Sequence, residues 1–161
     1  MKQYKGIIIL LNLILLLVIF NSSLVEKEEI LSEGKLVLLK LAPVDPRSLM
    51  QGDYMALRYE VANDIAVNEA PVRGYCVLMA DANNVAASVR FQKDPTPIDE
   101  DEILIKYRLV NGQLYIGAES YFFEEGQGKK FEEAVYGGLK IDEEGNSILI
   151  GLYDKEKSLI K

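Results

Sequence analysis

Histidine is absent from the 161-residue chain, and cysteine occurs once, at Cys76. Without histidine, no imidazole base can activate a serine or cysteine nucleophile, so active sites of the Ser-His-Asp and Cys-His types are excluded. A typical zinc site is not expected either, because zinc sites are built mainly from cysteine and histidine. We therefore predict no cofactor, no metal and no catalytic residue, and an enzyme is the less favoured interpretation.

A single cysteine also excludes an internal disulfide, so a domain exported from the cytoplasm would depend on a packed core. Cys76 lies in the apolar segment YCVLMA, residues 75–80. This setting favours a buried, inert thiol over a reactive one, because buried cysteine behaves as a small hydrophobic residue.

Basic residues are fewer than acidic ones, 18 against 25. All 25 acidic residues follow residue 25 but only 16 basic ones do, so this part of the chain has a formal charge of 16 − 25 = −9. Such a domain is repelled by phosphate backbones and by anionic lipid headgroups. Nucleic acid is therefore not an expected partner.

Charge is absent from residues 6–20, GIIILLNLILLLVIF, where Asn12 is the polar interruption. Extended to Val25, this run has about the 20 residues that a helix needs to cross a bilayer, so we expect contact with lipid through residues 6–25. Lys2 and Lys5 precede the run, which by the positive-inside bias places the N-terminus in the cytoplasm and the remainder outside. A cleaved signal peptide is the alternative. The residues that follow offer a weak cleavage signal, which favours an uncleaved anchor.

The chain is thus divided into an N-terminal membrane anchor, 1–25, an acidic linker, 26–34, and an extracytoplasmic β-rich domain, 35–161. The predicted fold class is mainly β, built of antiparallel hairpins with one short helix. Strands are expected at 35–41, 54–61, 72–80, 85–92, 103–110, 113–116, 135–141 and 147–152.

Turn residues separate these strands into hairpins at 72–92, 103–116 and 135–152. The clearest turn is Asn111-Gly112, because Asn-Gly accepts the positive φ angles of a type I′ turn. Two prolines make 93–102 a loop. Helix is expected over 128–135, and 60–69 fits either a short helix or a strand that runs into a loop.

GDYMALRY, residues 52–59, reads as a turn that leads into a strand. Gly52 permits a backbone conformation that is costly for other residues, and Asp53 can accept hydrogen bonds from backbone amides. Apolar and polar residues alternate after it, so we expect the segment to start a central strand. The motif positions with a structural or binding role are Gly52, Asp53, Tyr54, Leu57 and Tyr59.

A functional alternative groups Asp45, Arg47 and Asp53 in one polar site, where the guanidinium would clamp a carboxylate. A second group lies at 121–136, in YFFEEGQGKKFEEAVY. Its aromatic residues are expected to form part of the core and a lid. The carboxylates of Glu124 and Glu125 could instead face a pocket and bind a cation or an amine. The members considered are Tyr121, Phe122, Glu124, Glu125, Gly126 and Tyr136.

GDYMALRY matches letter for letter the pattern that names the GDYxxLxY family. DPRSLMQGDYMALRYE, residues 45–60, resembles the family's first block, and residues 121–152 are similar to its second. The family comprises bacterial membrane-anchored proteins without an assigned biochemical activity. The resemblance implies an inner-membrane protein whose outward-facing domain works beside polytopic membrane partners.

A weaker resemblance is to signal peptidase-like serine proteases, since Pro46, Leu49, Gly52 and Asp53 look like part of their pattern. The position of the nucleophilic serine is occupied by Pro43, and a catalytic lysine, with Lys93 and Lys106 as candidates, would have to be buried. The resemblance therefore implies at most a related β-scaffold without the catalytic groups.

Two classes of function remain open. The favoured one is a membrane-anchored accessory or interaction module. The alternative is a carboxylate-based hydrolase that uses carboxylates near Asp53 and Glu125, or a small-ligand sensor, with a degenerate protease least favoured.

Overall fold

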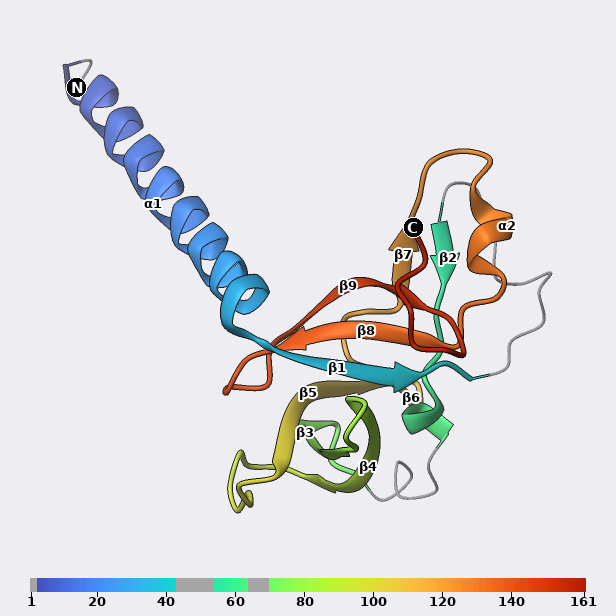
Figure 1. Cartoon of the computed structure of the whole chain (residues 1–161). Coiled ribbons are helices and arrows are strands. Elements are labelled where there is room, and N and C mark those ends of the chain that lie inside the picture. The colour runs from blue at the N-terminus through green and yellow to red at the C-terminus, as the bar shows by residue number, and fades with distance from the viewer. Residues whose placement is uncertain (1–2, 43–53, 64–69) are drawn as a thin grey trace.

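The computed structural model describes residues 3–42, 54–63 and 70–161. Figure 1 shows one long helix that projects from a β-rich body. This architecture confirms the predicted fold class, a mainly β domain preceded by one apolar helix.

Helix α1 spans Gln3–Glu33 and is long and apolar enough to cross a membrane. No glycine or proline lies between Gly6 and Gly34, so no helix-breaking residue interrupts it. The acidic segment 26–34, predicted as a linker, is helical through Glu33. The segments predicted as anchor and linker therefore form one continuous helix from Gln3 to Glu33.

The main sheet has seven strands in the order β6-β5-β3-β4-β1-β8-β9. It curls on itself, and the backbone N–H of Lys106 in β5 donates to the carbonyl oxygen of Gly145, in the β8–β9 turn, at 2.8 Å. The strands are β1 Lys35–Lys40, β3 Arg73–Ala80, β4 Val85–Gln92, β5 Glu102–Val110, β6 Gln113–Tyr115, β8 Tyr136–Ile141 and β9 Ser147–Tyr153.

The three predicted hairpins are confirmed as β3–β4, β5–β6 and β8–β9. Asn111 and Gly112 have φ angles of 52° and 77°, as the expected type I′ turn requires. In the β3–β4 turn, Asp81 Oδ1 accepts hydrogen bonds from the backbone N–H groups of Asn83 and Val85. Turn chemistry close in sequence thus sets these pairings.

Strand β1 departs from the prediction of purely antiparallel hairpins. It pairs antiparallel with β8 but parallel with β4, where Leu38 lies opposite Val85. Val37, Leu38 and Leu39 are all buried, as expected for a strand covered on both faces.

The expected central strand at 54–61 is wrong. Strand β2, Tyr54–Ala56, pairs with β7, Ser120–Phe122, in a separate sheet that has two strands within the described part of the chain. The chain then forms an isolated bridge from Tyr59 to Leu41 and enters the 3-10 helix η2, Glu60–Asn63. The alternation itself is confirmed, because side chains 55, 57, 59 and 61 are buried and 56, 58 and 60 are exposed.

Helix signals gave mixed results. Helix α2 spans Gly128–Phe131, shorter than the predicted 128–135. Of the ambiguous segment 60–69, the first four residues form η2, and 64–69 lie outside the described residues.

The core fills the inside of the curled sheet with apolar side chains from β1, β3, β5, β8 and β9. Cys76 lies among them with no exposed surface, which confirms the prediction of a buried thiol. Core members include Val37, Leu39, Leu78, Ile105, Leu139 and Leu152.

Candidate functional site

The motif residues from Tyr54 to Tyr59 connect the small β2–β7 sheet to the main core. Met55 lies opposite Tyr121 and Tyr54 opposite Phe122, so the strand brings together the two blocks singled out in the sequence. Leu57 is 3 % exposed, and its backbone N–H donates to the carbonyl oxygen of Glu119 at 2.8 Å.

Tyr59 is the most enclosed polar residue of the described motif segment, Tyr54–Tyr59. Its side chain is 3 % exposed, and its hydroxyl donates to the carbonyl oxygen of Ala118 at 2.7 Å. Burial raises the pKa of the phenol far above its usual range, with a smaller contribution from the charge of Glu119. The hydroxyl therefore serves as a neutral hydrogen-bond donor inside the fold.

The aromatic residues of 121–136 divide between core and surface. Phe131 is buried, and its ring packs edge-on against that of Tyr121 with the ring centroids 5.0 Å apart. The centroid of the Phe123 ring lies 5.4 Å from that of Phe131. Phe122 is 74 % exposed, and its ring lies beside that of Tyr54 with the ring centroids 5.7 Å apart. Tyr136, the first residue of β8, is half-buried.

The carboxylates of this block do not form a desolvated pair. Glu124 and Glu125 are exposed, and Glu124 Oε2 accepts a hydrogen bond from Gln127 Nε2 at 2.7 Å. Gly126 has a φ of 83°, as a turn residue. Acid-base chemistry needs one carboxylate held apart from solvent, and this arrangement does not supply it.

The polar site predicted for Asp45, Arg47 and Asp53 lies outside the described residues. These three residues and Gly52 belong to 43–53, so the site stays a prediction. Within 3–42, 54–63 and 70–161, no group of three or more His, Cys, Asp or Glu side chains is arranged to hold a metal ion.

Of the two lysines considered for a protease dyad, Lys93 is exposed and Lys106 has a structural role instead. Lys106 Nζ donates to Asn146 Oδ1 at 2.8 Å, and Asn146 in turn is held by Asp142 in the β8–β9 turn. The Lys106 side chain is 42 % exposed, so it lacks the burial that a lysine base requires.

A tight joint connects α1 to the β-rich domain. Ile30, near the end of the helix, is 7 % exposed. Gly34 follows, where a Cβ atom would overlap the carbonyl oxygen of Ile30 and lie 3.2 Å from the backbone N and O of Ile141. Lys140 Nζ donates to the Gly34 carbonyl oxygen at 2.7 Å. The helix end is therefore packed on β8.

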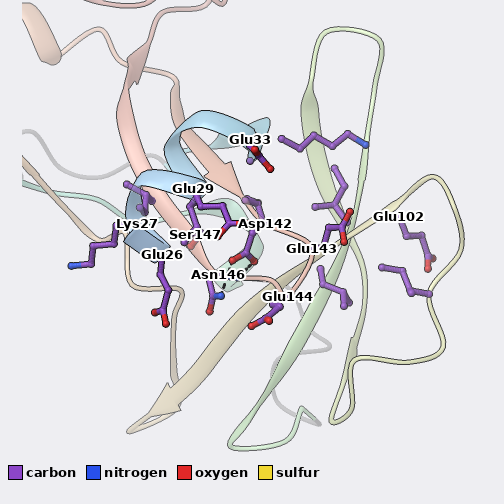
Figure 2. A pocket seen from close by; sticks show the side chains of 18 of the residues that line it. Glu26, Lys27, Glu29, Glu33, Glu102, Asp142, Glu143, Glu144, Asn146 and Ser147 are labelled. Carbon is purple, nitrogen blue, oxygen red and sulfur yellow. Dashed lines mark hydrogen bonds between the residues drawn. The ribbon is translucent and has the colours of Figure 1, made fainter. Parts of the chain in front are cut away.

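A cleft of about 1180 Å³ opens at this joint. Figure 2 shows side chains from the end of α1 facing those of the β8–β9 turn and of the segment that leads into β5. Two lysines line the cleft, Lys27 and Lys35, against eight carboxylates. The carboxylates are Glu26, Glu29, Glu33, Glu100, Glu102, Asp142, Glu143 and Glu144. We call this feature the acidic cleft.

One carboxylate of the acidic cleft, Glu102, has its negative charge balanced by an arginine. Glu102 accepts hydrogen bonds from both terminal nitrogens of Arg90, one at 2.7 Å, and from the backbone N–H of Asp99 at 3.0 Å. The Arg90 bonds, followed by the Asp99 bond, lower the pKa of Glu102 to about 2. Most other carboxylates remain exposed, so the cleft attracts cationic groups.

The model of the GDYXXLXY protein family matches residues 16–152. The chain belongs to this family. No curated protein and no solved structure matches the chain. The match includes the distal half of α1, the motif around Tyr59 and the last two strands, so the helix and the domain fall within one family unit.

Sequence reasoning missed the acidic cleft. The three acidic runs that build it were interpreted separately, as a linker at 26–34, a loop at 93–102 and a turn at 142–146. Their common sign was a visible signal. Their proximity depends on how the sheet curls, which sequence periodicity does not report.

Proposed function

We propose that this protein is a membrane-anchored accessory module of the bacterial inner membrane. Helix α1 holds the acidic β-rich domain at the outer surface, where the domain acts with polytopic membrane partners. The apolar length of α1 supports the anchor. Membership of the GDYXXLXY family also supports the proposal, because the family resemblance implies a membrane-anchored protein.

The proposed orientation places the N-terminus in the cytoplasm and residues 35–161 outside. Lys2 and Lys5 flank the apolar run on one side, and Glu26, Glu28 and Glu29 follow it on the other. Positive charge is retained on the cytoplasmic side, which supports this direction.

The observation that carries the proposal is the joint at Ile30 and Gly34. A domain packed directly on the end of its anchor stays close to the bilayer, in contrast to one on a flexible tether. Its acidic cleft begins where the apolar residues of α1 end, and anionic headgroups are repelled from it. Cationic segments of neighbouring membrane proteins are the groups that suit this position.

Topology is tested with an introduced thiol. Glu132 is exposed and lies outside the acidic cleft, and the natural Cys76 is buried. In intact cells, a membrane-impermeant maleimide should label Glu132→Cys in the full-length chain and leave the parent chain unlabelled. Labelling only after the cells are broken would contradict the outward orientation.

Partnership is tested by crosslinking in native membranes, followed by extraction in mild detergent. The double variant Glu26→Lys/Glu29→Lys reverses charge in the acidic cleft, and Glu132→Lys/Glu133→Lys makes the same change on another exposed surface. We expect a stoichiometric polytopic partner that is lost with the first variant and kept with the second. Recovery of the parent chain alone would contradict the accessory function.

A further inference from the structure

Asn12 is the polar side chain within the apolar part of α1, between Gly6 and Phe20. It is exposed, and no side-chain hydrogen bond to it occurs within the described residues. In the hydrocarbon core of a bilayer, an amide without a hydrogen-bond partner is costly, because no water is present to satisfy it. Asparagine in this position bonds across to a neighbouring helix.

Asn12 lies on the face of α1 that meets the β-rich domain at the other end of the helix. Asn12 and Ile30 are separated by about five full helical turns at 3.6 residues per turn, so they lie on the same face. Within Tyr4–Glu33, Ile30 is the residue with a buried side chain, and it lies at the end of α1 that contacts β8 and β9. Leu16, Ile19 and Ser23 lie between them on this face, within about 40° of Asn12.

The same face leads into the acidic cleft, since Ser23, Glu26 and Ile30 are among the residues that line it. A helix packed along Asn12 and Leu16 would therefore leave the bilayer directly above eight carboxylates. Basic residues at the outer end of that helix would be attracted there.

We propose that the face of α1 that carries Asn12 docks a transmembrane helix of another membrane protein, whose outer end is basic. The proposal rests on the membrane-spanning role of α1 given above, and it names the surface and the chemistry of the partner. A second copy of this chain does not suit the site. Two copies packed through this face would bring together two acidic clefts and two domains of formal charge −9 each.

The test places a photo-crosslinking amino acid at Leu16 of the full-length chain in native membranes. Ile14 is the matched control, because it lies about 160° away around the helix. We expect a crosslink from position 16 to a membrane protein with an excess of Lys and Arg just outside its helix, and none from position 14.

Moving the amide provides the second measurement. The double variant Asn12→Leu/Ile14→Asn keeps the composition of the span and shifts the polar group to the other side of α1. We expect the yield at position 16 to fall roughly threefold or more, in line with the strength of interhelical hydrogen bonds in membranes. Glu26→Lys/Glu29→Lys should also lower it.

Several results would overturn the inference: a crosslink of doubled mass containing only this chain, a partner without a basic outer end, lipid adducts alone at position 16, or a yield unchanged by the amide shift. The maleimide experiment separates these failures from failure of the proposed function. If Glu132→Cys is labelled from outside, the anchored domain stands and only the docking face is wrong. If the chain is absent from the membrane, both proposals fail.

Discussion

The ring of Tyr59 lies directly against the backbone of Gly137. A Cβ atom at Gly137 would be 2.9 Å from Tyr59 Cε1 and 3.0 Å from its hydroxyl oxygen. Gly137 is in β8, opposite Leu39 of β1 and Leu152 of β9. The last tyrosine of the GDYMALRY segment thus occupies space that a side chain on β8 would otherwise fill.

Replacement of the Tyr59 hydroxyl should destabilise the fold. In Tyr59→Phe, the carbonyl of Ala118 loses its buried donor, and we expect the free energy of unfolding to fall by about 1–2 kcal/mol. Tyr54→Phe is the control, because Tyr54 is half-buried and its hydroxyl makes no hydrogen bond within the described residues. Urea unfolding of both variants checks this, and equal midpoints would contradict it.

Addition of a methyl group at Gly137 should be destabilising for a different reason. Gly137→Ala places Cβ inside contact distance of the Tyr59 ring, and we expect a loss of about 1–3 kcal/mol. A shorter side chain removes the overlap, so the pair Gly137→Ala and Tyr59→Leu should couple favourably by about 1 kcal/mol in a double-mutant cycle. Strict additivity would show that the strain at Gly137 has another source.

Acid sensitivity should depend on Glu102. Its pKa is lowered to about 2 in the folded chain by the Arg90 hydrogen bonds, below the ordinary value of 4.5. The unfolded chain therefore binds a proton more readily, and the stabilisation is present above about pH 4.5 and is lost as the pH falls toward about 2. Glu102→Gln should lower the melting temperature at pH 7 and flatten its decline over that acidic range.

The control for this measurement is Glu100→Gln. Glu100 is an exposed carboxylate of the same segment and has no ion pair within the described residues. Thermal melts monitored by circular dichroism at a series of pH values should leave this variant close to the parent. An identical pH profile for Glu102→Gln would mean that the Arg90 interaction adds no acid-dependent stability.

The joint should be sensitive to a side chain at Gly34. In Gly34→Ala, the Cβ atom would overlap the carbonyl oxygen of Ile30 and lie 3.2 Å from the backbone N and O of Ile141, so the end of α1 has to shift. We expect α1 to separate from β8 while the sheet remains folded. In detergent micelles, a glutamate-specific protease should then cut after Glu33 several times faster. Gly6→Ala is the control, because a Cβ atom there meets nothing within 4 Å. Equal cutting rates in the two variants would contradict the role of the joint.

The local parts of the fold were predictable because their determinants are close in sequence. Asn111-Gly112 encodes its own turn, and the apolar length of residues 6–25 identifies the helix. The parallel pairing of Leu38 with Val85 was not predictable, since nothing in the sequence of either segment indicates that the two are partners. The strand expected through residue 61 ends at Ala56, and the chain beyond it bridges to Leu41 at Tyr59 and enters η2.

The candidate site was predictable only in its ingredients. Acidic runs and the absence of histidine are visible in the sequence, but the acidic cleft forms because the packing of Ile30 and Gly34 on β8 brings the helix end above the β8–β9 turn. Pairing of the motif with β7 was likewise invisible, although both segments were singled out. Burial of Tyr59 against Gly137 depends on the motif segment lying across β8. The periodicity of apolar residues in the sequence does not predict this arrangement.

In the membrane-spanning arrangement proposed above, α1 is unbroken through Glu33 and is packed at Gly34, so it would fix both the height of the domain above the bilayer and its azimuth about the helix axis. One residue inserted after Val25 would raise the domain by about 1.5 Å and turn it by about 100° around the helix axis. Seven inserted residues, close to two turns, would nearly restore the azimuth at a height increased by about 10 Å. Height and azimuth are therefore coupled through helical pitch, and a change in spacer length alters which neighbours the domain faces before it alters how far it reaches.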